Sequence, residues 1–207
     1  KLSTPTVTFD RPLYNTTVPR VVSNNYKGAK AATEHLIMHG RKRILCLGGE
    51  TDLYTIKERI RGYKEAVRQA GLDVIIDTSV KDYPSAESAI ESHFYSSNPP
   101  DAVFALKNSA TIYACEVFQK VNISVPKKVA LIGFDDFQLA STLRPSISVV
   151  RQPAEDVGRI ATELLFDQLM NARRGMPFHG DKTKPQHIKL ENQLVLRNSC
   201  GCKIGMD

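Results

Sequence analysis

The sequence predicts an α/β protein built on doubly wound parallel sheets. Short runs of valine, isoleucine and phenylalanine alternate with helical patterns at a spacing of roughly 25–30 residues, which is typical of repeated strand–helix–strand units. The strand runs are apolar throughout, as expected when helices cover both faces of a sheet. The 207 residues are 42% hydrophobic and 24% charged. A chain of this size can form a core without a disulfide scaffold or a metal.

The order of strand and helix signals along the chain supports this class. Strands are expected at residues 6–9, 20–23, 44–47, 74–76, 102–105, 129–132, 147–150, 188–190 and 194–196. Helices are expected at residues 26–39, 56–70, 85–96, 109–121 and 154–171. Apolar residues recur every three or four positions in these helices. Gly40 and Gly71 are typical C-terminal stops, and Ser85 is expected to cap the third helix.

Membrane and nucleic-acid partners receive no support from these residues. No apolar run approaches the ~18 residues of a membrane span, and no signal segment opens the sequence. The net charge is +6, from 28 basic and 22 acidic residues. The basic run Arg41-Lys42-Arg43 follows a predicted helix end, where cations complement the helix dipole. We therefore predict no membrane contact and no DNA-reading surface in this part of the protein.

Polar side chains follow the predicted strands, at the edge where parallel sheets bind ligands. The candidate ligand-binding residues at these strand ends are Asp10 and Arg11, Glu50, Tyr54, Thr55 and Arg59, Lys81–Tyr83, Lys107–Ser109, Phe134–Asp136, and Arg151 and Gln152. Carboxylates and amides pair with hydroxyl groups, and arginine offers a planar fork of donors. The set suits a sugar, a polyol or a nucleobase. Each of these residues taken singly could instead be a cap or a turn residue.

Catalytic motifs are absent from the sequence. It contains no G-x-S-x-G, G-x-x-x-x-G-K-[ST], G-x-G-x-x-G or H-E-x-x-H pattern. We predict no catalytic residue, no cofactor and no enzymatic activity. One alternative is a magnesium-dependent α/β enzyme, in which the twin carboxylates Asp135-Asp136 at a strand end hold the ion.

Two short motifs contain metal-ligand residue types. His35 and His39 have the i, i+4 spacing of ligands on one helix, but no third ligand is evident, so we expect exposed side chains. Cys200 and Cys202 form a C-x-C without a second pair, so we expect no zinc site.

Several segments together resemble the lactose-repressor (LacI/GalR) family of bacterial transcription regulators. They are Gly40–Ile44, Arg59 with Gly62-Tyr63, Val129–Phe137, Leu143–Pro153 and Leu194–Cys200. The resemblance extends over nearly the whole chain in the family's order and spacing. It implies a two-lobed, periplasmic-binding-protein-like type I core that binds an effector between its lobes.

The resemblance also implies a division into lobes. Residues 1–23 and 153–183 would belong to the DNA-proximal lobe, which would be incomplete here. Residues 24–152 and 184–207 would form the distal lobe. The family's helix-turn-helix domain is absent from this sequence, so operator DNA would be bound through a missing N-terminal part.

The family's site positions map onto single residues of this chain. The resemblance assigns Arg59, Asp135 and Tyr83 to effector binding, hydroxyl recognition and stacking, and Gln152 and Asp10 to further ligand contacts. Lys107 departs from the usual asparagine. A lysine there favours an acidic or phosphorylated ligand, or a different polar network.

The implied function is that of a cytoplasmic, homodimeric repressor. A sugar or related small polar metabolite would bind in the cleft and shift operator affinity. The alternative is a periplasmic sugar-binding transport protein of the same architecture.

Overall fold

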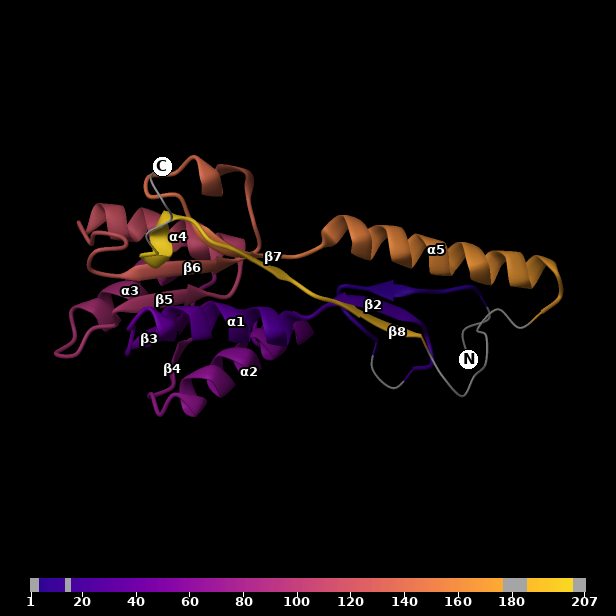
Figure 1. The fold of residues 1–207 in the computed structure, drawn as a ribbon, viewed down its shortest axis with the longest axis horizontal. Helices are drawn as coiled ribbons and strands as arrows, with labels where there is room; N and C mark the ends of the chain where they lie inside the picture. The colour runs from indigo at the N-terminus through magenta and orange to yellow at the C-terminus, as the bar shows by residue number, and fades with distance from the viewer. Residues whose placement is uncertain (1–3, 14–15, 177–185, 203–207) are drawn as a thin grey trace. The chain divides into compact units, whose positions relative to one another are not determined.

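The computed structural model describes residues 4–13, 16–176 and 186–202, and it has the α/β class that the sequence predicts (Figure 1). The chain divides into two compact units. Unit 1 comprises Lys1–Asn24 and Pro153–Asn192, and unit 2 comprises Asn25–Gln152 and Gln193–Asp207. None of the helices in the described ranges is long and apolar enough to cross a membrane.

Unit 2 is built on a six-stranded sheet with the strand order β4-β3-β5-β6-β7-β9. Its strands are β3 (Ile44–Leu47), β4 (Ile75–Asp77), β5 (Ala102–Ala105), β6 (Ala130–Phe134), β7 (Ser148–Arg151) and β9 (Gln193–Val195). Neighbours from β4 to β7 are parallel, whereas β9 is antiparallel to β7. The predicted parallel, doubly wound sheet is confirmed, with one antiparallel strand added at this edge. The chain leaves unit 2 along β7 and re-enters it along β9, so the two strands run in opposite directions.

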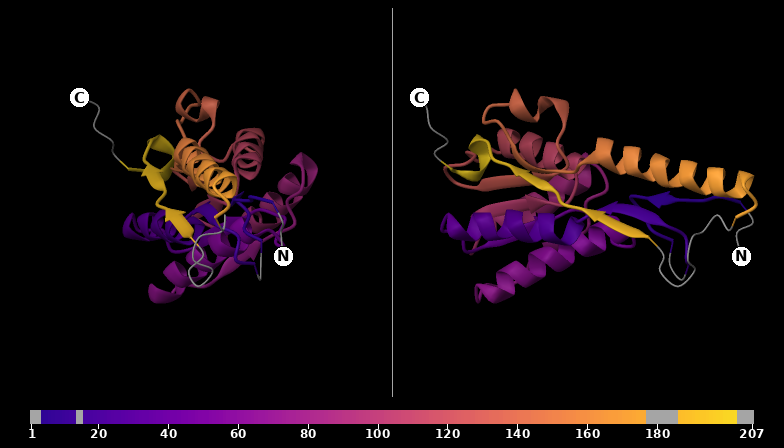
Figure 2. Two further views of the ribbon diagram at one scale, coloured as in Figure 1. Left: turned by 90° about the vertical axis from the view of Figure 1, so that its right-hand side faces the viewer. Right: turned by 45° about the vertical axis from the view of Figure 1, so that its right-hand side comes forward.

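Helices cover both faces of this sheet, and the alternation of strand side chains explains why (Figure 2). Leu45 and Leu47 point into a core shared with α3 (Tyr83–Phe94) and α4 (Asn108–Lys120). Ile44 and Cys46 point into a second core, shared with α1 (Asn25–Met38) and α2 (Tyr54–Gln69). Because both faces are buried, the strands need no polar side, which confirms the doubly wound arrangement.

The residues at the helix ends explain where three of the helices of unit 2 begin or stop. Gly40 and Gly71 have φ values of 80° and 68°, a region that glycine enters without steric cost. The predicted cap of the third helix is wrong by one turn. Asp82 is the N-cap, and it exchanges hydrogen bonds with Ser85 at the third helical position in a capping box. The helix therefore begins at Tyr83.

Unit 1 contains a three-stranded parallel sheet and one long helix. The elements are β1 (Thr8–Phe9), β2 (Arg20–Ser23), β8 (His187–Leu190) and α5 (Ala154–Arg173). Val21 of β2 packs against Val157 and Ala161 of α5. The two remaining elements within the described ranges are short 3-10 helices of unit 2, η1 (Gln138–Ser141) and η2 (Asn198–Cys200).

One boundary of the lobe prediction needs correction. The units divide after residues 24, 152 and 192, whereas the sequence places the last division after residue 183. Residues 183 and 184 lie outside the described residues. The strand β8, expected in the distal lobe, instead pairs with β2 of unit 1, with Val21 opposite Ile188. Short apolar strands carry no information about which sheet they join, because pairing partners are chosen by tertiary contacts.

Candidate functional site

The strand order of unit 2 reverses between β3 and β5, and this reversal marks the edge where doubly wound sheets bind ligands. The chain passes from β3 outward to β4 and then returns to β5 on the other side of β3. The register places Leu47 opposite Ala105, and Ala105 opposite Gly133. The carboxyl ends of these three strands are therefore level. Side chains that follow them gather at one edge of the sheet.

Arg59 and Asp135 meet at this edge, as the sequence predicts for the two residues. Arg59 lies in α2 and is buried. Its Nη1 lies 3.3 Å from Asp135 Oδ2 and donates to the Leu106 carbonyl at 2.7 Å, while its Nε donates to Asn25 Oδ1 at 2.8 Å. Gln152 donates from its amide to Asp135 Oδ1 at 2.5 Å. The carboxylate is thus held between a guanidinium and an amide.

The backbone of Asp135 is strained. Its φ is 74°, in the left-handed region that costs a non-glycine residue free energy. The peptide is anchored nonetheless, because its N–H donates to the Val150 carbonyl at 2.9 Å. Such strain is found mainly where the surrounding structure needs a particular side-chain direction. Asp10 and Glu50, which also follow strands, share this backbone region with φ values of 59° and 56°.

Lys107 follows β5 and forms an ion pair with Glu50, its Nζ lying 3.0 Å from Oε2. The two residues follow β5 and β3, the strands on either side of the reversal. Lys107 is the more buried partner, since its side chain is 19% exposed and that of Glu50 is 55% exposed. This ion pair favours the second of the two interpretations of Lys107, in which the lysine belongs to a different polar network instead of binding an acidic ligand.

The other three candidates are placed differently. Thr55 is buried at the start of α2, one turn before Arg59. Tyr83 begins α3, and its ring meets Tyr113 edge-on with centroids 6.4 Å apart. Asp10 lies in unit 1, directly after β1. The structure thus brings Arg59, Asp135 and Gln152 into one network. It does not join Asp10, Thr55 or Tyr83 to that network.

Three further residues contribute to this edge: Asn25 was not predicted, whereas Glu50 and Phe134 were expected here only as residues that follow strands. Asn25 orients Arg59, Glu50 neutralises Lys107, and the ring centroid of Phe134 lies 3.7 Å from the guanidinium carbon of Arg59. A signal for Asn25 existed, since it follows the strand that ends at Ser23. The role of Phe134 had no signal, because a strand phenylalanine normally belongs to the core.

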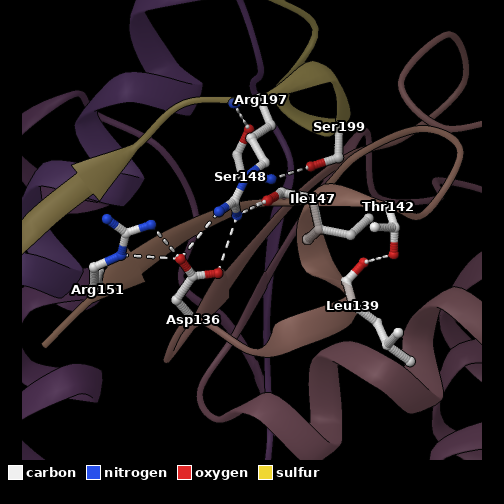
Figure 3. A network of polar contacts seen from close by, with 8 residues as sticks. All are labelled: Asp136, Leu139, Thr142, Ile147, Ser148, Arg151, Arg197 and Ser199. Atoms are coloured by element: carbon white, nitrogen blue, oxygen red, sulfur yellow. Dashed lines mark hydrogen bonds and ion pairs between the residues drawn. The ribbon is translucent and has the colours of Figure 1, made fainter.

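Asp136, the neighbour of Asp135, has a structural role (Figure 3). Its carboxylate accepts hydrogen bonds from Arg151 Nε at 2.9 Å and from Arg197 Nη1 and Nη2 at 3.1 and 3.0 Å. Burial opposes ionisation of Asp136, but these hydrogen bonds outweigh it and keep its pKa below the usual value. Because one carboxylate is paired with Arg59 and the other with two arginines, a magnesium ion would have to compete with these guanidinium groups for both aspartates.

The two motifs expected to stand alone are in contact with each other. His35 Nε2 lies 2.9 Å from Cys202 Sγ, and Cys200 Sγ lies 3.0 Å from the same sulfur. His35 is buried rather than exposed, whereas His39 is exposed as expected. Burial opposes ionisation of Cys200, but its contacts with His35, Ser148 and Cys202 outweigh this and lower its pKa to about 6. These contacts join residues up to 167 positions apart, so local spacing could not predict them.

Comparison with known proteins identifies the family to which this chain belongs. The profile of the periplasmic binding protein-like domain matches residues 33–200, and the chain belongs to that family. Its relatives are transcription regulators. It is 31% identical over 179 residues to the HTH-type transcriptional regulator CelR of Thermobifida fusca, covering 85% of this chain and 50% of the relative.

Solved structures place the chain more narrowly, among the cores of LacI-family regulators. The transcriptional regulator CelR–cellobiose complex has a TM-score of 0.79 at 31% identity, covering 93% of this chain and 58% of that one. A regulatory protein of the LacI family from Chloroflexus aggregans has a TM-score of 0.82 at 27% identity, covering 94% and 68%. The resemblance to the LacI family is therefore confirmed. The chain spans about half the length of the curated relatives it matches.

Proposed function

We propose that this chain is the effector-binding core of a DNA-binding transcription regulator, with a neutral sugar or polyol as the effector. The observation that carries the proposal is the Arg59–Asp135–Gln152 network at the carboxyl edge of the unit 2 sheet. Guanidinium, carboxylate and amide groups in contact offer donors and acceptors side by side. Each hydroxyl group of a sugar both donates and accepts hydrogen bonds, so neighbouring hydroxyls need donors and acceptors close together.

The charge balance at this edge favours a neutral ligand. Arg59 is paired with Asp135 and Lys107 with Glu50, so the two cations are matched by two anions. An anionic ligand would have to displace a carboxylate from one of these pairs. A sugar can bind the same groups through hydrogen bonds, without separating charges.

The relatives support this ligand class. The similar solved regulator is described as a complex with cellobiose, and another relative, 27% identical over 168 residues, is the ribose operon repressor of Escherichia coli. We expect Asp10, Thr55 and Tyr83 to add contacts to the bound effector. The regulator would act in the cytoplasm as a homodimer and would not be an enzyme.

Effector binding is tested by calorimetry with neutral mono- and disaccharides, beginning with cellobiose. For a sugar that binds, Asp135→Asn removes a charged acceptor and weakens affinity by about 10–100-fold, equivalent to roughly 1.5–3 kcal/mol for hydrogen bonds to a charged group. The matched control is Asp73→Asn, which alters an exposed aspartate before β4 and should leave the affinity unchanged. Equal affinity in the wild type and Asp135→Asn would remove Asp135 from the site.

The ligand class is tested with Lys107→Asn. If the effector is neutral, this change leaves its affinity nearly independent of salt, as in the wild type, because no ligand charge is lost. A wild-type preference for phosphorylated sugars that disappears in Lys107→Asn would contradict the neutral ligand. It would show that Lys107 reads an anion despite its pairing with Glu50.

Regulation is tested with the full-length protein and its operator DNA. A sugar that acts as the effector changes DNA affinity, and the DNA changes sugar affinity by the same factor, because the coupling free energy is shared. A sugar that binds tightly but leaves DNA affinity unchanged would favour a transport-type binding protein. Light scattering on the same sample measures the expected dimer.

A further inference from the structure

Four metal-ligand side chains meet at the end of unit 2 opposite the candidate effector site. His35 and His39 lie at the end of α1, and Cys200 and Cys202 lie at and just after η2. The helix α1 begins at Asn25, which contacts Arg59, and runs for 14 residues, about 20 Å. The cluster is therefore distinct from the Arg59–Asp135–Gln152 network.

The contacts centre on the sulfur of Cys202. His35 Nε2 lies 2.9 Å from it, Cys200 Sγ 3.0 Å and His39 Nε2 3.4 Å. The ligand atoms of His35, Cys200 and Cys202 all lie within 4.8 Å of one another, and these three form the group of possible metal ligands found among the described residues. His39 adds a fourth ligand atom, its Nε2, on the solvent side.

His39 is oriented as a metal-binding histidine would be. Its Nδ1 lies 2.8 Å from the carbonyl oxygen of His35. A carbonyl oxygen only accepts, so the proton lies on Nδ1 and the lone pair on Nε2 faces Cys202. Metal-ligating histidines almost always donate their second ring N–H to a carbonyl or carboxylate in this way.

The backbone between Cys200 and Cys202 turns so that the two side chains come together. Gly201 has a φ of 86°, in the left-handed region, and it ends η2. This turn brings the side chain of Cys202 back toward that of Cys200. Both sulfurs are free thiols, and Cys200 is fixed in the core beside α1.

We propose that His35, His39, Cys200 and Cys202 form a Cys₂His₂ site for a divalent transition metal, with Zn²⁺ as the best match. Thiolate and imidazole ligands suit Zn²⁺, which binds them tetrahedrally at about 2.3 and 2.0–2.1 Å. A tetrahedron with such bonds has ligand separations of roughly 3.3–3.8 Å. The three contacts of Cys202, at 2.9–3.4 Å, reach that size when the ligands move apart by a few tenths of an ångström to under ~1 Å. His39 lies outside the group whose ligand atoms are all within 4.8 Å of one another, so its ring must also move toward the other ligands. His39 is exposed and Cys202 is only half-buried, so these two side chains can supply this movement.

The metal ion would tie the end of α1 to the last described residues of the chain. More than 160 residues separate the two motifs, since His35 and Cys202 are 167 positions apart. The ion would therefore stabilise the packing of η2 on the sheet. It would act as a structural centre, because four protein ligands leave no open position for a reacting molecule.

The first experiment measures metal content and Co²⁺ spectra of the protein purified under reducing conditions. We expect one equivalent of zinc. After removal of zinc by a chelator, Co²⁺ should give the strong ligand-field bands of a tetrahedral site and a thiolate charge-transfer band. A spectrum typical of octahedral Co²⁺ without charge transfer would overturn the proposal.

Variants of single residues distinguish the loss of metal binding from a failure to fold. Cys200 is buried, so Cys200→Ser can fail to fold, whereas His39→Asn alters an exposed side chain and Cys202→Ser a half-buried one. Each of these two should weaken Co²⁺ binding by more than ~10–100-fold, the loss found even for residues that only support a ligand. Cys115→Ser, a free thiol on α4, is the matched control and should leave binding unchanged. Metal binding that survives both variants would refute the assignment. A reduced protein that takes up no zinc and forms a Cys200–Cys202 disulfide in air would instead make the pair a redox site.

Discussion

Replacing Asp136 by asparagine tests whether its arginine network stabilises unit 2. The bidentate pair with Arg197 is mostly buried, with side-chain exposures of 17% and 14%, and hydrogen bonds to charged groups of this kind contribute about 1.5–3 kcal/mol. The pair with Arg151 is 48% exposed on the arginine side, so it adds only ~0.2–1 kcal/mol. Asparagine retains one acceptor and turns an N–H toward a guanidinium. We therefore expect Asp136→Asn to lower the free energy of unfolding by about 2–4 kcal/mol.

The assay is urea denaturation of Asp136→Asn and the wild type, followed by circular dichroism. Asp73→Asn, which alters an exposed aspartate before β4, is the matched control and should stay within about 0.5 kcal/mol of the wild type. A loss below ~0.5 kcal/mol in Asp136→Asn would refute the reasoning, because it would mean that the arginines are equally well satisfied by water.

The same network predicts a pH dependence of known sign. The pKa of Asp136 is lower in the folded protein than its ordinary value. Its contribution to stability is therefore complete above about pH 3.9, the value for an unfolded chain, and is lost as the pH falls through the folded pKa. The stability difference between the wild type and Asp136→Asn should shrink below about pH 4. A difference that stays constant down to pH 2 would contradict the ionic origin.

Two further predictions concern packing. Ser199 is buried, accepts from the Ser148 N–H at 2.8 Å and donates to the Leu131 carbonyl at 2.6 Å, so Ser199→Ala leaves two backbone groups unsatisfied and should cost about 2–4 kcal/mol in urea denaturation. A loss below ~1 kcal/mol would indicate that water replaces the hydroxyl. Gly62→Ala would place a Cβ 2.2 Å from a backbone oxygen of α1, forcing α1 and α2 apart at a cost of about 1–3 kcal/mol. Gly158→Ala on α5 meets open space and should be neutral or stabilising by up to ~1 kcal/mol; equal melting temperatures for the two alanine variants would contradict the clash.

The sequence by itself determined the class of the fold and much of the site. Apolar strands at a regular spacing require helices on both faces, and the alternation of Leu45 and Leu47 with Ile44 and Cys46 shows why both helix layers are needed. The shared edge of Arg59, Asp135 and Gln152 could be predicted because parallel strands end together. The family resemblance then singled out these three among the many polar residues that follow strands.

Only the tertiary structure decided which polar residues contact one another. Asp135 and Asp136 are identical in chemistry and adjacent in sequence, yet one faces Arg59 and the other faces Arg197. A local pattern cannot distinguish them, because their partners lie 76 and 61 positions away along the chain.

The same limit applies at the sheet edges and at the metal-ligand cluster. The strand β8 joins β2, and β9 runs antiparallel to β7, through backbone pairing that no side-chain pattern encodes. His35 meets Cys202 across 167 positions, a distance at which spacing rules for metal ligands carry no signal. Periodicity reports the environment of a residue along its own element, whereas the contacts that make a site are set by how separate elements pack.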